Sequence, residues 1–189
     1  MKKIMGVLLL CLCAQAFAGA VSIAGVNLED KITVDKKELA LNGAGLRTKV
    51  IFNVYVGALY LSQKKNAADE IFADKGPKRV ELHILRHITA GDFMDAFNKA
   101  INANHTPEEY VPVAARLLRF GRSFREVGEV DKGSLIILDF MPETGMTVLT
   151  VNRKEITRIE GADFFNAMLK IWLGKNPVQD SLKKEMLGG

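Results

Sequence analysis

The sequence predicts an α+β fold in which a largely antiparallel sheet carries helices on one face. The first observation is the order of segments: strand-like segments come first, helical segments follow, and strands and then helices return after residue 133. A parallel α/β fold would instead alternate strand and helix throughout. The second observation is the segment 51–61, whose two alternating faces are both mainly apolar, as in a central strand covered on both sides. No repeat or Pro/Ser-rich linker interrupts the chain, which favours a single domain.

The N-terminal segment has the pattern of a cleavable secretory signal peptide. A basic start, "MKK", precedes the apolar run "IMGVLLLCLC", and Ala16–Ala18 forms an A-x-A cleavage site. We therefore expect a signal peptide over residues 1–18, one domain over residues 19–189, and a periplasmic location. Cys11 and Cys13 both fall in the leader, so the domain would contain no disulfide and no thiolate.

Charge and hydropathy argue against nucleic-acid binding and against a membrane-spanning helix in the domain. The chain has 26 basic and 22 acidic residues, two of the basic ones in the leader, so the domain lacks the basic excess typical of nucleic-acid binding. No later stretch has the apolar length of a transmembrane helix. A run of arginines three residues apart winds around a helix and favours a solvated face, with an anionic partner or lipid surface as the alternative. These arginines are Arg116, Arg119, Arg122 and Arg125.

Short alternating or apolar runs between turn residues predict the strands. The predicted segments are 21–29, 31–43, 51–61, 78–88, 134–140, 146–152 and 156–161. Arg47 precedes the central strand, which carries Tyr55. On one straight strand the eight residues between them would span about 26 Å, too far to share a small pocket. A tight turn near Thr48 and Lys49 would bring them together, but no glycine, proline or Asn-Gly pair there indicates one.

Helical periodicity and start signals predict four later segments, at residues 89–104, 106–127, 162–174 and 176–188. Thr89 is the expected N-cap of the first. The second begins with a Thr106 N-cap, Pro107 at the first helical position and Glu109 to complete a capping box. Pro112 is expected to kink the start of that helix.

Metal and cofactor chemistry find no support in the sequence. His83 and His87 lie four residues apart on a predicted strand, about 13 Å from one another, too far to share one metal ion. The run "GAGLRT" leads into a strand rather than a helix, so no helix N-terminus faces a phosphate. The G-x-S-x-G, H-E-x-x-H and G-x-x-x-x-G-K-[ST] motifs are all missing.

Arg47 and Tyr110 are the candidate binding residues. Gly43 and Gly45 permit close backbone approach beside Arg47, and the strand beyond is apolar, which indicates that the guanidinium is drawn inward. A buried guanidinium needs an anion, either an internal carboxylate or the carboxylate or phenolate of a ligand. Tyr110, in the first turn of a capped helix, either covers the edge of the core or points toward a ligand.

Three segments carry a resemblance to a known family. The run "LNGAGLRTKVIFNVYVGALYL" resembles the G-x-G-x-R turn and following strand of the chalcone isomerase superfamily, and "TPEEYVP" resembles the segment with its active-site tyrosine. The C-terminal "ADFFNAMLKIWLGKNPVQDSLKKEMLG" resembles that family's pattern of helix, glycine, turn and short helix. With its leader, the chain looks most similar to a bacterial secreted branch of chalcone isomerase-like proteins.

The resemblance implies an open-faced β-sandwich, with a ligand cleft between a large antiparallel sheet and the helices on one of its faces. Arg47 matches the family's arginine, Tyr110 its tyrosine, and Tyr55 a strand threonine of the plant enzymes. Two further polar positions of the plant site fall on Leu117 and Ile171, which makes the implied cleft more apolar.

This pattern favours a non-catalytic periplasmic binding protein for a fatty acid or similar amphiphilic anion, because a few polar anchors on an apolar lining suit such a ligand. One alternative is a chalcone isomerase-type intramolecular lyase acting on an enone or phenolic substrate, with Arg47 and Tyr110 as its catalytic residues. The other is an interaction module whose cleft is filled and whose Arg47 is neutralised internally.

Overall fold

The structure is a computed structural model that describes residues 21–189. The expected signal peptide, residues 1–18, and the first two residues of the expected domain lie outside this range. The strands are β1 Val21–Ile23, β2 Val26–Leu28, β3 Lys31–Val34, β4 Lys37–Lys49, β5 Phe52–Leu61, β6 Lys78–Ile84, β7 Ile88–Thr89, β8 Glu129–Val130, β9 Leu135–Met141, β10 Met146–Val151 and β11 Lys154–Glu160. The helices are α1 Ala68–Ala73, α2 Ala90–Asn104, α3 Pro107–Tyr110, the 3-10 helix η1 Val111–Val113, α4 Ala114–Val127, α5 Ala162–Leu173 and α6 Asp180–Met186.

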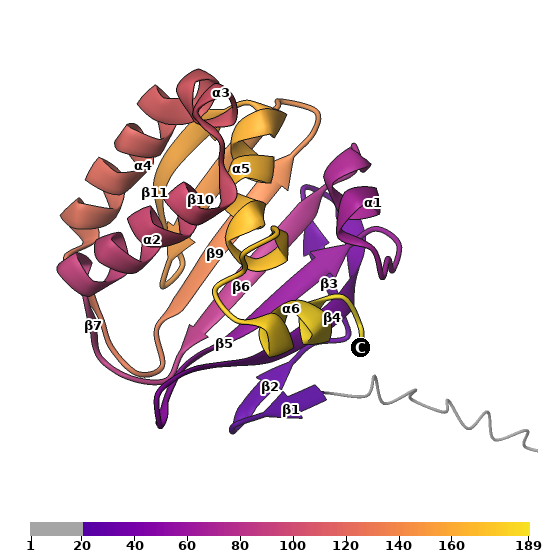
Figure 1. Cartoon of the computed structure of the whole chain (residues 1–189). Coiled ribbons are helices and arrows are strands. Elements are labelled where there is room, and N and C mark those ends of the chain that lie inside the picture. The colour runs from indigo at the N-terminus through magenta and orange to yellow at the C-terminus, as the bar shows by residue number, and fades with distance from the viewer. Residues whose placement is uncertain (1–20) are drawn as a thin grey trace, which may run out of the picture.

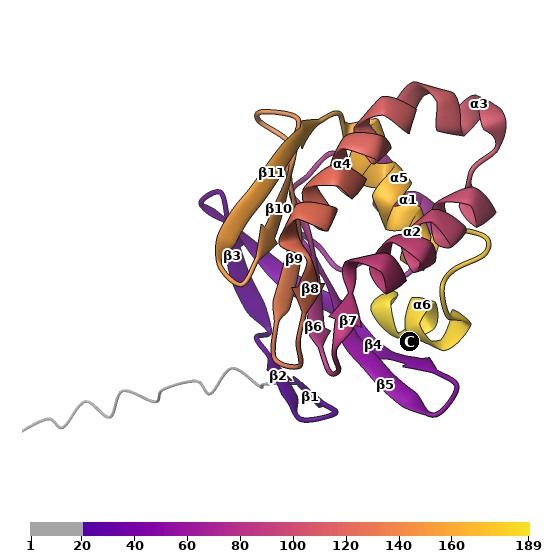
Figure 2. The ribbon, with the colours of Figure 1, turned by 90° about the vertical axis from the view of Figure 1, so that its left-hand side faces the viewer.

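A seven-stranded antiparallel sheet, in the order β11-β10-β9-β6-β5-β4-β3, forms the body of the protein. Helices α2, α4, α5 and α6 lie on one face of this sheet (Figures 1 and 2). The pairs β1-β2 and β7-β8 form two small additional sheets. The predicted α+β class, with helices on one face of an antiparallel sheet, is confirmed.

Strand β5 is covered on both sides, as its two apolar faces predicted. Leu59 and Leu61 belong to the main core, which also includes the buried residues of α2, α4 and α5. Val56, Ala58 and Tyr60 belong to a second, smaller core on the other side of the sheet. A strand between two apolar layers is fixed in register, because a slip of one residue would exchange the two sets of side chains.

The expected straight path from Arg47 to Tyr55 is wrong. β4 ends at Lys49 and β5 begins at Phe52, so a two-residue turn reverses the chain at Val50 and Ile51. Val50 adopts a φ of +58°, a conformation that turns normally assign to glycine, asparagine or aspartate. A β-branched residue there is rare, which is why the local residue types did not indicate the turn.

The helix-start signals agree with the structure. The Thr89 side chain accepts a hydrogen bond from the backbone N–H of Asp92 at 3.1 Å, and Thr106 forms a complete capping box with Glu109. The predicted helix over 106–127 is divided into α3, η1 and α4, with the 3-10 turn centred on Pro112. Helix α1 was not predicted, because its six residues are too few for a clear periodic pattern.

The two glycines of β4 allow the C-terminal helix to lie directly on the strand. A Cβ at Gly43 would meet the backbone carbonyl oxygen of Glu185 at 2.1 Å, and one at Gly45 would overlap the Glu185 side chain. Asn42, directly before Gly43, donates to the backbone oxygens of Met186 at 2.8 Å and Lys65 at 2.9 Å. The predicted close approach therefore exists, and the approaching element is α6.

We predict that Gly43→Ala destabilises the protein by about 2 kcal/mol, because the new methyl group collides with backbone and α6 must move away. Gly57→Ala on β5 is the matched control, since a Cβ there would meet only side chains at ordinary distances of 3.4–3.7 Å. Urea unfolding of the two variants measures the difference. Equal stability of Gly43→Ala and the parent protein would contradict the close packing of α6.

Candidate ligand cavity between the sheet and the helices

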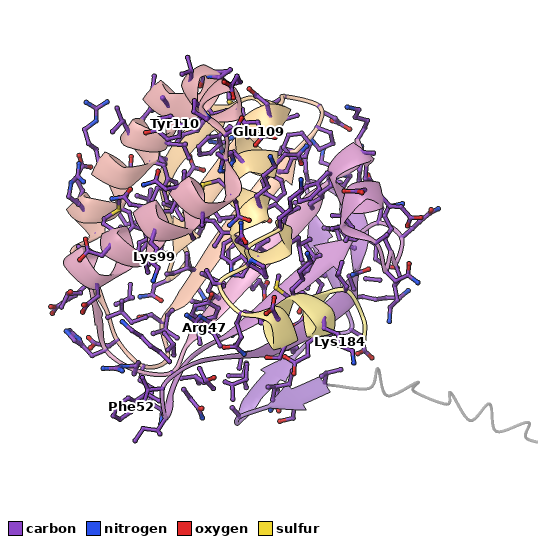
Figure 3. All side chains as sticks on the ribbon, in the orientation of Figure 1. Arg47, Phe52, Lys99, Glu109, Tyr110 and Lys184 are labelled. Carbon is purple, nitrogen blue, oxygen red and sulfur yellow. The ribbon has the colours of Figure 1, made fainter. Side chains whose placement is uncertain are left out.

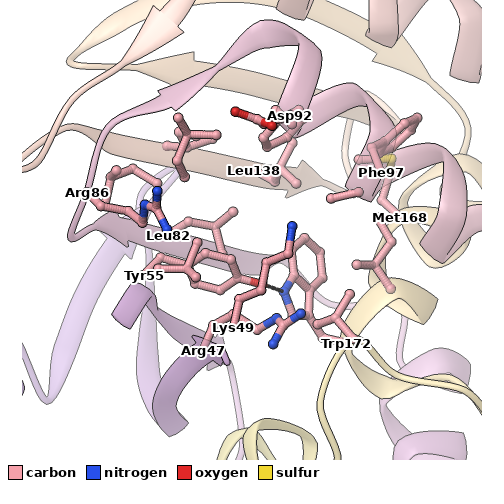
Figure 4. Close-up of a pocket in the computed structure, with 18 of the residues that line it drawn as sticks. Arg47, Lys49, Tyr55, Leu82, Arg86, Asp92, Phe97, Leu138, Met168 and Trp172 are labelled. Atoms are coloured by element: carbon pink, nitrogen blue, oxygen red, sulfur yellow. Dashed lines mark hydrogen bonds between the residues drawn. The ribbon is translucent and has the colours of Figure 1, made fainter. Parts of the chain in front are cut away.

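A cavity of about 200 Å³ lies between the sheet and helices α2, α4 and α5 (Figure 4). Its floor comes from β5, β6 and β9, and its roof from the three helices. Most lining side chains are apolar. They are Val54, Leu82, Ile84, Ile88, Phe93, Ala96, Phe97, Phe120, Ile136, Leu138, Met168, Ile171, Trp172 and Val178. The polar and charged side chains are few and include Arg47, Lys49 and Tyr55. An apolar chamber with a few polar groups is the usual composition of a small-molecule site.

Arg47, near the end of β4, lies at the edge of this cavity and is held by uncharged acceptors. Its Nη1 donates to the Oε1 of Gln179 at 3.1 Å and to the backbone oxygen of Thr48. Within residues 21–189 the Arg47 guanidinium forms no ion pair with a carboxylate. Both hydrogen bonds use the same nitrogen, so the remaining edge of the guanidinium keeps its capacity to bind an anion.

Gln179, the residue before α6, fixes the hairpin end that carries Arg47. Its Oε1 also accepts from the backbone N–H of Thr48 at 2.9 Å, while its Nε2 donates to the backbone oxygen of Leu46 at 2.9 Å. One amide thus bonds to three consecutive residues of β4. This arrangement restricts the orientation of the guanidinium, and such preorganisation would lower the entropy cost of binding an anion there.

Tyr55 is the direct cross-strand partner of Arg47 in the β4-β5 pair. Its hydroxyl oxygen accepts a hydrogen bond from Trp172 Nε1 at 2.9 Å (Figure 4). A phenol that accepts in this way still has its own proton to donate. Burial raises the pKa of Tyr55 to about 12. The hydrogen bond from Trp172 and the positive charge of Arg47 both lower this pKa, but burial has the larger effect. The phenol therefore stays neutral, and able to donate, at physiological pH.

The turn at Val50 and Ile51 brings Arg47 and Tyr55 together. Directly opposed residues of an antiparallel pair have Cα atoms about 4.5–5.5 Å apart, far from the 26 Å of a straight strand. The register shifts between Arg47 and Thr48, where β5 contains the extra residue Val54. The structure thus unites two of the three predicted site residues at one end of the cavity.

The third predicted residue, Tyr110, lies elsewhere. It lines a separate hollow of about 290 Å³ between α2, α3 and α4, and it is not among the residues that line the cavity of Arg47. Among the described residues Phe97 is the one that lines both hollows. Of the two positions expected to make the cleft more apolar, Ile171 lines the cavity and Leu117 lines the second hollow.

Further basic groups surround the mouth of the cavity. Lys49 and Arg86 both line it and are exposed, and the Arg86 guanidinium lies over the Phe52 ring, 5.1 Å from its centroid. His87 also lines the mouth, but it is paired with Asp131, 2.8 Å from its Nδ1. The mouth therefore combines three cationic side chains, Arg47 among them, with the carboxylate of Asp92, and this excess of positive charge is in a position to attract an anion.

The remaining charged candidates have local roles. Arg116 forms a bidentate ion pair with Asp163, at 2.6 and 2.7 Å, and Arg119 lies 3.6 Å from Glu160, so these arginines attach α4 to the segment joining β11 and α5. His83 is hydrogen-bonded to Glu81 at 3.0 Å. In residues 21–189 no group of three or more His, Cys, Asp or Glu side chains is arranged to hold a metal ion. None of the helices in the same range combines the length and apolar character needed to cross a membrane.

Fold and cavity together define a class of protein, an open-faced sheet-and-helix domain with an internal, mainly apolar cavity. The family model described as chalcone isomerase-like matches residues 20–188. The chain therefore belongs to the chalcone isomerase-like family, as its motifs predicted. The crystal structure of a fatty-acid binding protein from Arabidopsis thaliana is similar, with a TM-score of 0.68, 15% identity, and coverage of 89% of this chain and 96% of that chain. At this identity the likeness shows the fold. No curated protein matches the chain at a significant level.

Sequence reasoning missed several residues of the site. Gln179 gave no signal, because an isolated glutamine before a short helix has many ordinary roles. Trp172 lay within the predicted helix over residues 162–174 and received no role of its own. Lys49 and Arg86 were hidden because their importance depends on the turn between β4 and β5. One signal could have found part of the site. The indole N–H of the chain's single tryptophan can donate but not accept a hydrogen bond, so a buried tryptophan indicates an acceptor nearby.

We predict that the free energy of unfolding falls as the pH rises from 10 to 12, and that Tyr55→Phe reduces this fall by about 2–3 kcal/mol. The folded-state pKa of Tyr55 is raised, so the unfolded chain loses this proton first, and stability present below pH 10 is lost above it. Chemical denaturation at several pH values measures the slope. Tyr60, whose pKa is also raised by burial, remains in both proteins and contributes equally. Identical pH slopes would contradict the buried state of the Tyr55 phenol.

Proposed function

We propose that the protein is a non-catalytic periplasmic binding protein for a fatty acid or a similar amphiphilic anion. The acidic head binds Arg47 and Tyr55, and the apolar body occupies the cavity beneath α2 and α5. The periplasmic location rests on the signal-peptide pattern of residues 1–18. The structural neighbour from Arabidopsis thaliana, a fatty-acid binding protein, supports the ligand class.

The observation that carries this proposal is the state of Arg47. A guanidinium partly withdrawn from water at the edge of an apolar chamber normally needs a carboxylate nearby. In the described part of the chain Arg47 has only the amide oxygen of Gln179 and a backbone carbonyl. A ligand carboxylate would supply the missing negative charge, accepting from the guanidinium and from the Tyr55 hydroxyl.

The size and lining of the cavity select the rest of the ligand. Its volume of about 200 Å³ is below the roughly 300–1,000 Å³ of pockets for drug-sized molecules. A hydrocarbon chain of modest length fits a space of this size, and the apolar lining matches such a chain. Because Ile171 is apolar and Tyr110 lies in another hollow, the cavity offers few polar groups to orient a substrate for cyclisation. Binding without catalysis is therefore the better account.

We predict that Arg47→Gln weakens the binding of a saturated fatty acid to delipidated protein by roughly 10- to 100-fold, as expected when a charge-assisted hydrogen bond is lost. Arg122→Gln, an exposed arginine on α4 that lines neither hollow, is the matched control and is expected to bind as the parent protein does. Isothermal titration calorimetry measures both affinities, and thermal melting verifies that each variant is folded.

Two results would refute this function. Unchanged affinity in Arg47→Gln would show that the anionic head binds elsewhere. Conversion of a chalcone to a flavanone by the parent protein, lost in Arg47→Gln, would show that the same arginine serves the isomerase reaction instead.

A further inference from the structure

The tip of the β4-β5 hairpin exposes three consecutive apolar side chains. Val50, Ile51 and Phe52 are 91%, 82% and 55% exposed, whereas large apolar residues elsewhere in the described chain are mostly buried. Figure 3 shows Phe52 at the outer limit of the molecule, at the opposite end from Tyr110. We call these three residues the apolar tip. Three adjacent exposed apolar residues at the end of a projecting hairpin are typical of an interaction site.

The backbone conformation of the apolar tip does not favour the residue types found there, so the turn alone does not explain them. Val50 has a φ of +58°, where a β-branched side chain is strained. The other two-residue hairpin turns place Ala24-Gly25, Asp35-Lys36 and Asn152-Arg153 at their positive-φ positions, and each pair includes a glycine, aspartate or asparagine. Glycine or asparagine at position 50 would relieve this strain. A strained residue that is nevertheless present indicates a functional role at that position.

Two basic residues lie beside the apolar tip, one on β4 and one on the segment after β6. Lys49 precedes it, and Arg86, from the segment after β6, lies over its Phe52 ring. Residues 47–53 include no acid. Acids occur around His87, the residue after Arg86: Asp92 lines the same cavity, and Glu129 and Asp131 lie 3.8 and 2.8 Å from nitrogens of His87. An apolar end flanked by cations matches a bilayer with anionic headgroups, where apolar side chains enter the acyl region and basic ones remain at the surface.

The apolar tip is continuous with the ligand cavity. Lys49, directly before the tip, and Val54, two residues after it, line the cavity, and Arg86 does so from the segment after β6. A protein docked through this tip would therefore hold the mouth of its cavity at the level of the lipid headgroups. An amphiphilic anion would pass between bilayer and cavity with its head beside Arg47 and without crossing bulk water.

We propose that the apolar tip, with Lys49 and Arg86, inserts into an anionic lipid bilayer and that the ligand is exchanged there. The ligand exchange rests on the proposed function, but the docking itself is a property of the empty protein. Three apolar side chains and two cations give a weak, reversible attachment, which suits a carrier that leaves the membrane after loading.

Co-sedimentation with vesicles tests the docking. We expect the protein to bind vesicles of equal parts phosphatidylglycerol and phosphatidylcholine, and to bind phosphatidylcholine vesicles at least about tenfold more weakly. Val50→Asn/Ile51→Ser is expected to lower binding to the anionic vesicles by about tenfold or more. Every protein compared carries the same N-terminus, so a difference reports the tip.

A matched control removes exposed apolar side chains at the far end of the molecule. Val111 and Leu118, on η1 and α4, are 72% and 62% exposed, and Val111→Ser/Leu118→Ser is expected to bind vesicles as the parent does. The Val50→Asn substitution removes a strained residue, so the melting temperature of the tip variant is expected to be equal to or above that of the parent. Lost vesicle binding therefore cannot be attributed to unfolding.

The outcomes separate the two proposals. Equal vesicle binding by the parent and the tip variant would overturn the docking proposal, as would a parent that self-associates in solution through the tip while ignoring vesicles. Fatty-acid affinity in solution is expected to be the same in the parent and in the tip variant, because neither Val50 nor Ile51 lines the cavity. Tip-dependent vesicle binding by a parent without fatty-acid affinity would refute the proposed function and leave the docking intact.

Discussion

The positive charge of Arg47 is the constraint around which this end of the protein is organised. Most partly buried guanidinium groups are neutralised by a carboxylate of their own chain, because an unpaired charge near an apolar interior is costly. Here the groups that hold Arg47 are the oxygens of Gln179 and the Thr48 backbone. Neutral acceptors orient the guanidinium but leave its charge available. The apolar chamber beside it then favours a ligand that is both anionic and hydrocarbon-rich.

The geometry of this arginine depends on contacts between β4 and the C-terminal segment, which is distant in the sequence. Gly43 and Gly45 lack side chains, which allows α6 to lie directly against β4. That close approach places Gln179 within hydrogen-bonding distance of β4, where it bonds to Leu46 and Thr48 as well as Arg47. The C-terminal segment and the β4-β5 hairpin are therefore one structural unit, and the conformation of the hairpin sets both the position of Arg47 and that of the exposed tip.

Sequence reasoning recovered the parts of the fold that depend on local chemistry or on regular periodicity. The caps at Thr89 and Thr106, the two-sided burial of β5 and the close approach at Gly43 all follow from properties of a few neighbouring residues. The turn at Val50 could not be predicted, because its residue types contradict its backbone conformation.

The candidate site was predictable only in part. Arg47 was found because a charged residue directly before an apolar strand can be recognised from the sequence alone. Tyr55 was predicted to lie too far from Arg47, because the sequence did not indicate the turn between them. Its position beside Arg47 follows from the pairing of β4 with β5. Gln179 and Trp172 come from the last two helical segments and reach the site only through tertiary packing. The position of Tyr110, likewise, is set by how α3 packs against α2 and α4 and not by its capping box.

The most direct test of the account is the carboxyl titration of a bound fatty acid labelled with ¹³C at its carboxyl carbon and followed by NMR. A carboxylate that accepts from Arg47 and Tyr55 is stabilised in its charged form, so its pKa in the complex should lie below that of the same acid bound to Arg47→Gln. A bound carboxyl group with the same pKa in both proteins would contradict the account, because the head of the ligand would then lie away from the guanidinium.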